Sequence, residues 1–354
     1  MKVLLVIPSL GAGGAERVIS GLANDWCHKN RCEIEIAVLS NAPAFYQIDE
    51  RIKIHRLGYR GGQGVFFKVF GLICVLFRLR KLMRSITPNV CMSFIRESNI
   101  ITILASRWLG LKIVISERDS SKAIVSRVYR LLRKTLYPLA DGLIVQTEDY
   151  KDFILKEVGL ISLKVIPNPV RNIKCELGNR EKIIVNVGRL IEEKGQGYLL
   201  EAFSLCKHAE DWKLVILGDG ILKNSLISKA DELGVIERVK FLGQTKDVDS
   251  WLCRSSVFAF SSISEGFPNA LAEAMSASLP CVSFDCVAGP RDLINDGLNG
   301  YLVEVGDVAA FARRIDELIQ SASLRAEIGC RAKSDSEKLD FAYISEEYFD
   351  FLQG

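Results

Sequence analysis

Residues 257–275 read VFAFSSISEGFPNALAEAM, a pattern that predicts a strand, a short loop and a helix. The apolar run at 257–262 is typical of a buried strand in a parallel sheet. Pro268 fits the first turn of a helix, because its missing backbone N–H costs nothing there. An apolar helical stripe follows at Leu271, Ala274 and Met275. The segment therefore predicts one strand–helix unit, with Glu265 in the loop and Glu273 one turn inside the helix.

The start of this helix is a candidate site for an anion. The backbone N–H groups of Phe267, Asn269 and Ala270 are expected to point out of the helix N-terminus, which favours a phosphate. The neighbouring carboxylates of Glu265 and Glu273 can accept hydrogen bonds from sugar hydroxyls. The alternative is that Glu265 faces solvent and that Glu273 balances the helix dipole.

Strand and helix patterns alternate through both halves of the chain. Apolar runs such as VLLVIPS at 3–9 and KIIVNVG at 182–188 are separated by helical patterns, as in parallel sheets covered by helices. A chain of 354 residues is long enough for two domains. We therefore expect an α/β protein with two Rossmann-like, doubly wound domains facing across a cleft. Its ligands should bind beyond the carboxyl ends of the strands.

The predicted domains have the following bounds. The N-terminal domain covers residues 1–168 and the second domain residues 181–333, with the polar stretch 171–180 as a linker. Residues 334–354 form a final segment rich in aromatic and acidic side chains. The run MKVLLVIP at 1–8 is short and precedes no small-residue cleavage site, so we expect a first strand and not a secretory signal.

Charge and cysteine content narrow the class of protein. The net charge of +3 conceals nine Lys or Arg residues and no Asp or Glu between Arg51 and Arg84. No nucleic-acid recognition motif accompanies this charge, so we expect an anionic membrane surface as a partner and no nucleic acid. The ten cysteines form no Cys-x-x-Cys pair and no zinc pattern, which indicates buried thiols in a reducing cytoplasm.

Residues 65–84 are apolar first and basic last. The uninterrupted apolar run from Val69 to Phe77 is too short to span a bilayer. The segment is either a core helix with a basic end or an interfacial helix that lies on anionic lipid. Further basic residues on a later predicted helix favour the membrane; they are Arg127, Arg130, Arg133 and Lys134.

Two other motifs imitate cofactor sites. Gly13 and Gly14 follow the first strand, but Glu16 replaces the third glycine of a dinucleotide fingerprint, and no acidic residue ends the second strand. A nicotinamide enzyme is therefore not expected. Asp247 and Asp249 imitate a metal-binding Asp-x-Asp motif, but they lie in a polar stretch where an Asp is expected to cap a helix. We expect no metal and no cofactor.

Taken together, the motifs resemble family 4 of the retaining glycosyltransferases, which have the GT-B fold. Glu265 and Glu273 match the Glu-x7-Glu motif of that family, and the resemblance covers nearly the entire chain. Their order and spacing make the set specific. The other matching segments are 13–16 (GGAE), 188–190 (GRL), 193–195 (EKG), 218–220 (GDG) and 297–303 (GLNGYLV).

The resemblance implies a role for each donor-side residue. Arg189 and Lys194 would stabilise the negative charge that grows on the leaving diphosphate, although such residues are usually a solvated surface pair. Glu265 would lie by the sugar hydroxyls and Glu273 by the ribose. The remaining expected donor contacts are Gly13 and Gly14 at the diphosphate, Gly243 and Gln244 at the base, and the helix start at Phe267, Asn269 and Ala270.

The acceptor side departs from the family pattern. Many relatives carry a His where this chain has Glu117 and Arg118. Glu117 is our candidate for orienting or deprotonating the acceptor hydroxyl. The alternative is a strand-end Glu that pairs with Arg118.

The resemblance also implies an activity. The expected enzyme moves a hexose or N-acetylhexosamine from a UDP-sugar to a growing, polyprenyl-diphosphate-linked bacterial glycan, with retention at the anomeric carbon. It would be cytoplasmic, attached peripherally at the inner face of the cytoplasmic membrane, with its terminal helix crossing back to the first domain. The alternative hypotheses are a GT-B-type UDP-sugar epimerase and a non-catalytic membrane adaptor.

Overall fold

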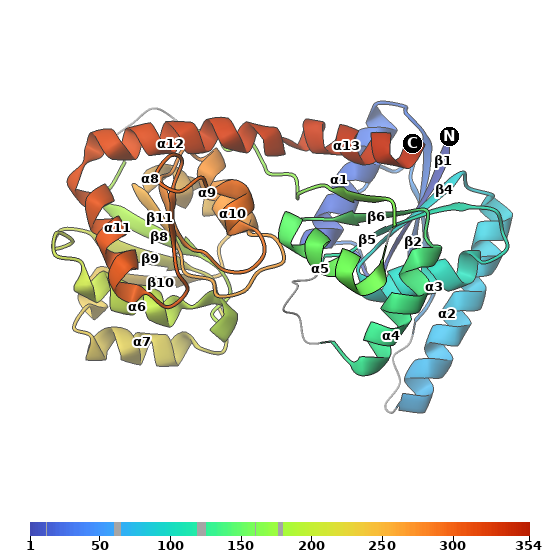
Figure 1. Cartoon of the computed structure of the whole chain (residues 1–354), viewed down its shortest axis with the longest axis horizontal. Coiled ribbons are helices and arrows are strands. Elements are labelled where there is room, and N and C mark those ends of the chain that lie inside the picture. The colour runs from blue at the N-terminus through green and yellow to red at the C-terminus, as the bar shows by residue number, and fades with distance from the viewer. Residues whose placement is uncertain (12, 60–64, 119–124, 160, 176–179) are drawn as a thin grey trace. The chain divides into compact units, whose positions relative to one another are not determined.

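The computed structural model describes residues 1–354 except 12, 60–64, 119–124, 160 and 176–179. The chain forms two compact units (Figure 1). The first unit holds Met1–Asn168 together with Ala342–Gly354, and the second unit holds Pro169–Phe341.

The first unit is built on a seven-stranded sheet in the order β3-β2-β1-β4-β5-β6-β7. All neighbouring strands are parallel, and β1 lies between β2 and β4. Its apolar central strands are buried on both faces, as the sequence pattern predicts. The strands are β1 (Lys2–Ile7), β2 (Glu33–Val38), β3 (Lys53–Arg56), β4 (Val90–Phe94), β5 (Lys112–Ser116), β6 (Gly142–Val145) and β7 (Leu163–Val165).

Helices cover both faces of this sheet (Figure 1). The core of one face joins the strands to α2, α3 and α5, and α4 packs beside α3. On the other face α1 packs with α13. The helices are α1 (Gly14–His28), α2 (Val65–Ile86), α3 (Arg96–Ser106), α4 (Arg127–Leu136), η1 (Tyr137–Leu139), α5 (Glu148–Val158) and α13 (Phe341–Gln353).

The last helix is held in the first unit by aromatic side chains. The rings of Trp26 and Phe349 lie 5.6 Å apart, and Trp26 donates a hydrogen bond to the Ser345 carbonyl at 3.3 Å. Tyr348 stacks near Phe94. Tyr343 on the same helix is 56% exposed. The buried aromatic residues therefore fix α13, and Tyr343 takes no part.

The second unit repeats the plan with six parallel strands in the order β10-β9-β8-β11-β12-β13. Its central strand β8 lies between β9 and β11. The strands are β8 (Ile183–Val187), β9 (Lys213–Leu217), β10 (Val239–Gly243), β11 (Val257–Phe260), β12 (Cys281–Phe284) and β13 (Tyr301–Val303).

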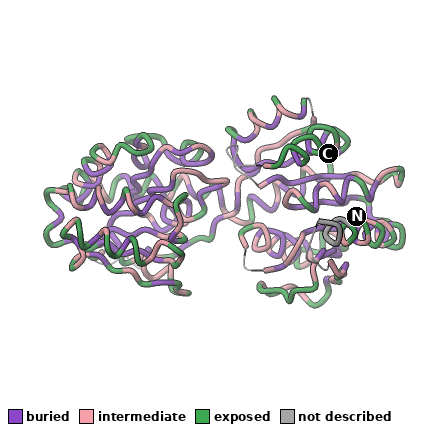
Figure 2. The backbone as a smooth tube through the Cα atoms, turned by 90° about the horizontal axis from the view of Figure 1, so that it is seen from below, coloured by how far each residue is buried: buried purple, intermediate pink, exposed green. Residues whose placement is uncertain are grey.

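Two apolar cores bury the faces of this second sheet. One core joins the strands to α6, α7 and α11, and the other joins them to α8, α9 and α12. Figure 2 shows buried residues inside each unit and exposed residues at its surface. The helices are η2 (Glu192–Lys194), α6 (Gln196–Leu205), α7 (Lys223–Glu232), η3 (Ile236–Arg238), α8 (Val248–Arg254), α9 (Asn269–Ser276), α10 (Pro290–Leu293), α11 (Val308–Gln320), α12 (Ala322–Ser336) and η4 (Glu337–Leu339).

These two parallel sheets confirm the predicted α/β fold class. Within the described parts of the chain, no helix has the length and apolar character that crossing a bilayer requires.

The prediction that all cysteines are buried thiols is wrong. Cys175 and Cys253 form a disulfide whose Cα atoms lie 5.2 Å apart, and Cys330 is exposed. Cys91 and Cys281 are buried thiols, as expected. The pairing depends on two segments 78 residues apart in sequence, a distance at which spacing alone is uninformative.

Candidate active site

The candidate donor residues of the second unit follow adjacent strands. Arg189 and Lys194 come after β8, and Glu265 comes after β11, its neighbour in the sheet. The strand order reverses at β8: β9 and β10 lie on one side of β8, and β11, β12 and β13 lie on the other. The carboxyl ends of strands at such a reversal are where open α/β sheets bind ligands.

Lys194 and Glu265 meet directly. Lys194 Nζ lies 2.5 Å from Glu265 Oε1, with side chains 21% and 9% exposed respectively. The loops that carry them are joined as well, because Ser261 Oγ donates to the Lys194 carbonyl at 2.9 Å. The Ile263 N–H donates to the Glu193 carbonyl, also at 2.9 Å. A cation and a carboxylate are thus held together at one strand edge.

Gly195 makes this close approach possible. Its φ is +60°, and a Cβ there would lie 2.1 Å from the Ser261 carbonyl oxygen. Any side chain would push the two loops apart, because real Cβ atoms do not come within 3.0 Å of such atoms. The glycine of the EKG motif therefore fixes the position of Lys194 relative to Glu265.

A second glycine contact supports the Arg189 turn. Gly218 has φ +143°, and a Cβ there would lie 1.9 Å from the Gly188 carbonyl oxygen. The Leu190 N–H donates to the Asp219 carbonyl at 2.9 Å. The Arg189 side chain is exposed and forms no ion pair with another described residue. Its backbone is thus positioned by the GDG segment while its guanidinium remains accessible.

The start of α9 differs in one respect from the prediction. The helix begins at Asn269, and Pro268 is its N-cap residue. The N–H of Asn269 donates to the Phe267 carbonyl at 2.9 Å, because the chain makes a tight turn through Pro268. The expectation that the Asn269 N–H points outward is therefore wrong. Phe267 is buried, whereas Asn269 is exposed and Ala270 half-buried.

Glu273 on α9 has a partner that the sequence did not indicate. Arg171 Nη2 lies 3.4 Å from Glu273 Oε1 and 2.8 Å from Asp249 Oδ1. Asp249 is thus an ion-pair partner of Arg171. Asp247 stands at the N-cap of α8, but its side chain makes no capping hydrogen bond, contrary to prediction. The Arg171 guanidinium instead connects α8 to α9.

A loop after β12 packs against the Glu265 segment. Ser264 and Val287 form a parallel β-bridge, and a Cβ on Gly289 would lie 2.2 Å from Pro268 Cδ. Ala288 has a φ of +70°, which is strained for a residue other than glycine. Burial, together with the negative charge of Glu265, raises the pKa of the Cys286 thiol to about 12. This loop thus presents a neutral thiol near the carboxylate.

The two candidate base contacts lie after β10. Gly243 has φ +71°, and a Cβ there would lie 3.9 Å from Lys223 Nζ. The Gly243 carbonyl accepts the Gly218 N–H at 2.9 Å, and Gln244 is exposed. Gly243 therefore lies next to the glycine that supports the Arg189 turn.

The glycine turn of the first unit lies after β1. Gly13 is the N-cap residue of α1, and Gly14 is exposed. A Cβ on Gly13 would lie 2.1 Å from Glu16 Oε2. Glu16 folds back over the turn and accepts a hydrogen bond from Ser9 Oγ at 2.9 Å. The small size of Gly13 leaves room for this carboxylate.

Glu117, the candidate for acceptor activation, is deeply buried. Its side chain is 1% exposed, and its Oε2 accepts hydrogen bonds from the hydroxyls of Tyr129, at 3.0 Å, and Tyr137. Burial, with the nearby Glu117 charge, raises the pKa of both tyrosines well above the usual range, so they remain donors.

Arg118 does not form the side-chain pair with Glu117 that we gave as the alternative. Only its backbone N–H reaches Glu117, at 3.3 Å from Oε1. Its guanidinium donates to Asn168 at 2.7 Å and to the Tyr348 hydroxyl at 2.8 Å, and it lies over the Phe94 ring. Arg118 thus binds the segment that leaves the first unit and the helix that returns to it.

A family comparison decides the class of this protein. Residues 172–335 match the family model described as glycosyl transferases group 1. The chain carries a group 1 glycosyl transferase domain. It is a glycosyltransferase, as the sequence predicts.

Full-length relatives of this glycosyltransferase have related names. A Campylobacter jejuni protein named GalNAc-alpha-(1->4)-GalNAc-alpha-(1->3)-diNAcBac-PP-undecaprenol alpha-1,4-N-acetyl-D-galactosaminyltransferase is 28% identical, covering 99% of this chain and 98% of that protein. A second C. jejuni protein is also 28% identical over the full length of both chains; its name is N-acetylgalactosamine-N,N'-diacetylbacillosaminyl-diphospho-undecaprenol 4-alpha-N-acetylgalactosaminyltransferase.

A solved structure shares the fold of this glycosyltransferase. HepE from Anabaena, crystallised in complex with UDP, matches with a TM-score of 0.85 over 100% of both chains, at 18% identity. This likeness supports the GT-B fold that the motifs implied.

Some residues around the candidate site of this glycosyltransferase belong to no motif in the sequence. Arg171 lies at the start of the predicted linker 171–180. A single basic residue in a polar stretch belongs to no motif, so nothing in the sequence singles it out. Cys286 and Ala288 follow β12, and only their position after a strand end could have drawn attention to them. Their roles depend on contacts between segments far apart in sequence.

Proposed function

We propose that this glycosyltransferase moves a hexose or N-acetylhexosamine from a UDP-sugar to a polyprenyl-diphosphate-linked bacterial glycan, with retention at the anomeric carbon. The observation that carries the proposal is the Lys194–Glu265 pair, fixed by Gly195 at the carboxyl edge of β8 and β11. A cation and a hydrogen-bond acceptor within 2.5 Å of each other suit a ligand that combines a diphosphate with a sugar.

The names of similar proteins support the donor and the acceptor. HepE is described in complex with UDP, and both C. jejuni relatives are named for undecaprenol-linked acceptors. These relatives are transferases, which disfavours the epimerase alternative.

The donor chemistry follows from charge. When the sugar–phosphate bond breaks, negative charge grows on the diphosphate, and the fixed ammonium of Lys194 stabilises that charge most in the transition state. The exposed Arg189 guanidinium adds a second cation. Glu265 accepts a hydrogen bond from a hydroxyl of the transferred sugar, and Glu273 accepts hydrogen bonds from the ribose hydroxyls of the nucleotide.

Retention is proposed from the Glu-x7-Glu motif formed by Glu265 and Glu273. Glu265 is engaged by Lys194 and is assigned to the sugar hydroxyls, so it is not our candidate for a covalent nucleophile. As the acceptor oxygen forms the new glycosidic bond, the sugar–phosphate bond breaks, UDP leaves with the electron pair of that bond, and the acceptor hydroxyl gives up its proton to the Glu117 carboxylate. Glu117 remains our proposed acceptor-side residue, acting through its Tyr129 and Tyr137 network.

The lipid of the proposed acceptor lies in a membrane, and we propose that the first unit binds the surface of that membrane. Val75, Leu79 and Met83 of α2 face the core, whereas Phe77 is 64% exposed on the same helix. Trp108, just after α3, is 87% exposed beside Arg107. Helix α3 contacts both α2 and α4, and these three helices carry further exposed apolar residues: Phe70, Leu72, Ile73, Leu104, Val128, Leu131 and Leu132.

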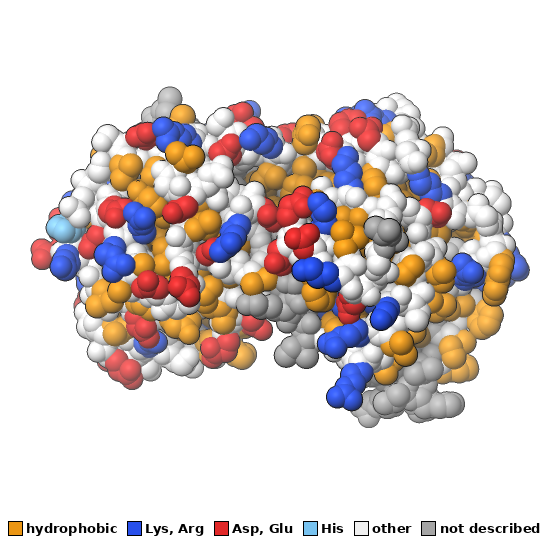
Figure 3. All heavy atoms as spheres, in the orientation of Figure 1, with side chains coloured by type: hydrophobic (Ala, Val, Ile, Leu, Met, Phe, Trp, Pro, Cys, Tyr) orange, Lys and Arg blue, Asp and Glu red, His pale blue; other side chains and the backbone are white. Residues whose placement is uncertain are grey.

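Basic side chains accompany this apolar surface. Lys81 and Arg84 on α2 are exposed, as are Arg127, Arg130 and Lys134 on α4. Figure 3 shows apolar and basic side chains side by side over the part of the first unit that holds α2 and α4. We propose that this surface attaches the enzyme peripherally to the inner face of the cytoplasmic membrane.

Three predicted membrane arginines have other partners. Arg78 donates to the Leu57 carbonyl at 2.7 Å, and Arg80 donates to the Ala105 carbonyl at the same distance. Arg133 is buried, pairs with Glu157 and donates to Tyr150. These guanidiniums stabilise the fold, so tests of membrane binding should leave them intact. Arg60 and the side chain of Lys68 lie outside the described residues.

A product analysis tests the proposed activity. The purified enzyme is incubated with UDP-hexoses and UDP-N-acetylhexosamines, with and without extracted polyprenyl-diphosphate-linked glycan. We expect sugar transfer only with the acceptor, and NMR should show an α-linked product from an α-linked donor. An epimerised UDP-sugar in the absence of acceptor, or a β-linked product, would contradict the proposal.

A further inference from the structure

The segment 170–175 of the second unit is fixed to its surroundings at several points. The Val170 N–H donates to the Leu339 carbonyl at 2.8 Å. Ser276 Oγ donates to the Arg171 carbonyl at 2.8 Å and accepts the Ile173 N–H at 3.1 Å. This segment contains Arg171, which contacts the proposed ribose residue Glu273.

A covalent bond can also fix this segment. Cys175 at its end pairs with Cys253 on α8, and their Cα atoms lie 5.2 Å apart, inside the range that a disulfide needs. Both cysteines are half-buried, so small thiols and disulfides can reach them. They differ in this respect from the buried thiols Cys91 and Cys281.

The same helix links the disulfide to the nucleotide side. Asp249 lies one turn before Cys253 on α8 and pairs with Arg171 at 2.8 Å. Arg171 reaches Glu273 on α9 at 3.4 Å. The disulfide and the two ion pairs therefore hold segment 170–175 against α8 and α9 at three adjacent points.

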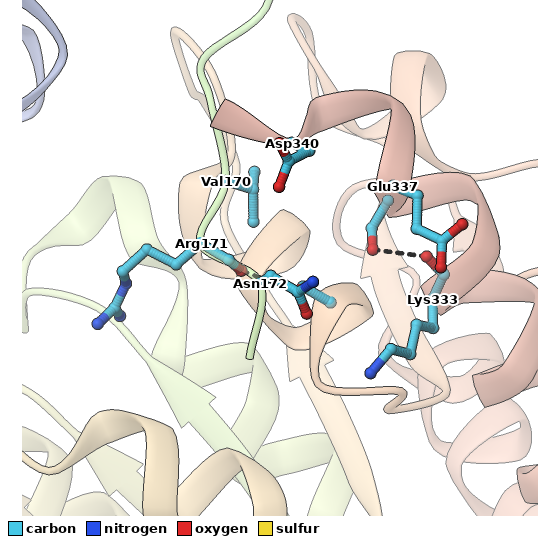
Figure 4. Close-up of a pocket in the computed structure, with 8 residues that line it drawn as sticks. Val170, Arg171, Asn172, Lys333, Glu337 and Asp340 are labelled. Atoms are coloured by element: carbon cyan, nitrogen blue, oxygen red, sulfur yellow. Dashed lines mark hydrogen bonds between the residues drawn. The ribbon is translucent and has the colours of Figure 1, made fainter. Parts of the chain in front are cut away.

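One side of this segment borders a cavity. A cavity of about 230 Å³ lies between residues 170–172 and residues 333–340. In Figure 4, Val170, Arg171 and Asn172 line one side, Lys333 and Glu337 line the other, and the Arg171 side chain extends away from Lys333. The cavity leaves residues 170–172 without packed neighbours on that side.

We propose that Cys175 and Cys253 form a reversible redox site that controls nucleotide affinity by fixing Arg171 against Glu273. This inference rests on the proposed function for the role of Glu273. In the disulfide form, Arg171 holds the Glu273 carboxylate in place for the ribose hydroxyls. In the dithiol form, segment 170–175 moves more freely and the carboxylate is held less well.

The chemistry is thiol–disulfide exchange with a small disulfide of the glutathione class. The thiolate of one cysteine attacks that disulfide, forming a mixed disulfide and releasing one small thiol. The thiolate of the second cysteine then attacks the protein sulfur and releases the other small thiol. Two protein thiols are oxidised and one small disulfide is reduced. In a reducing compartment such a pair is redox-active, whereas a permanent structural disulfide is rare there.

The pairing is tested by differential alkylation and mass spectrometry. The full chain is equilibrated with glutathione disulfide, alkylated, digested and compared with a sample reduced by dithiothreitol. We expect the Cys175 and Cys253 peptides to be joined after oxidation and separately alkylated after reduction. The exposed Cys330 should be alkylated by iodoacetamide in both samples or carry glutathione after oxidation. Alkylation of both Cys175 and Cys253 after oxidation would overturn the redox site.

The coupling is tested by the Kd for UDP, measured by calorimetry on both forms. We expect reduction to weaken binding about two- to fivefold, the scale of a part-exposed ion pair. Cys175→Ser with Cys253→Ser should bind UDP like the reduced form under both conditions, and Cys330→Ser should behave like wild type. Arg171→Gln should bind weakly and equally in both forms.

Equal UDP affinity of the oxidised and reduced wild type would overturn the coupling, as would a redox effect that persists in Arg171→Gln. Absence of UDP binding in both forms would contradict the proposed donor and, with it, the coupling. The mass-spectrometric result would still decide whether the redox site exists, so the two failures are distinguishable.

Discussion

The two strand edges that carry candidate residues are built differently. In the second unit, Lys194 and Glu265 are brought together by backbone contacts at Gly195, and both side chains keep some exposure. In the first unit, Glu117 is surrounded by tyrosine donors and is almost fully buried. The first arrangement leaves charged groups ready for a ligand, whereas the second satisfies its carboxylate internally.

The largest expected effect comes from Lys194→Ala. Loss of this fixed cation should reduce transfer by about 2–4 kcal/mol of transition-state stabilisation, a factor of roughly 30 to 1,000 in kcat/KM. Lys182→Ala is the control, because Lys182 also belongs to an ion pair of the second unit, with Asp211, but is exposed and precedes β8. Wild-type turnover in a folded Lys194→Ala protein would refute the donor assignment.

Gly218→Ala tests how much the close contact between Gly218 and Gly188 contributes to stability. The new Cβ would collide with the Gly188 carbonyl, so we expect the free energy of unfolding to fall by about 2–3 kcal/mol in denaturant titrations. The matched control is Gly234→Ala, where φ is also positive, at +68°, but no atom lies within 4 Å of the new Cβ. Equal destabilisation by both changes would show that the contact with Gly188 is unimportant.

The membrane surface should respond to charge. Lys81→Gln with Arg84→Gln removes two exposed cations, each contributing about 1 kcal/mol near an anionic surface. We expect weaker co-sedimentation with anionic vesicles, and the difference from wild type should shrink as salt shortens the Debye length below about 8 Å.

Lys213→Gln with Lys240→Gln is the matched control for that experiment, since both side chains are exposed on the second unit. Hydrolysis of the UDP-sugar by water should be unchanged by the Lys81 and Arg84 replacements. Equal vesicle binding by wild type and both double variants would remove α2 from the proposed membrane surface.

Glu117→Gln tests whether the buried carboxylate is structural. Loss of the charge-assisted bonds from Tyr129 and Tyr137 should cost about 1–2 kcal/mol of folding stability. If Glu117 also activates the acceptor, transfer should fall further than UDP-sugar hydrolysis, and the missing activity should not return when temperature is lowered to restore folding. An equal loss of both reactions would assign Glu117 to the fold alone.

The smallest effect is expected from chelation. Asp249 is engaged by Arg171, and the proposed charge stabilisation of the diphosphate comes from Arg189 and Lys194 without a metal ion. EDTA should therefore leave turnover largely unchanged when product formation is measured. Complete loss of turnover, restored by Mg²⁺ or Mn²⁺, would make Asp247 and Asp249 metal candidates again.

The sequence predicted what depends on local pattern. The strand–loop–helix unit at 257–275 forms because apolar strand residues, a loop and a helix start follow each other directly. It did not predict contacts between distant segments. Arg171 reaches Glu273 and Tyr129 reaches Glu117 only after folding, and the Asn269 N–H is occupied because of the backbone turn through Pro268. Composition and residue spacing do not predict contacts between segments that meet only in the folded protein.

The division of the first unit into two sequence segments has a consequence for synthesis. Trp26 emerges from the ribosome before the second unit, but its partner Phe349 is synthesised only after that unit. The second unit, Pro169–Phe341, is continuous and is complete before α13 has been made. Domains fold as units while the chain grows. The first unit therefore leaves the apolar surface around Trp26 uncovered until α13 has been synthesised, so it reaches its final form only after the second unit is complete.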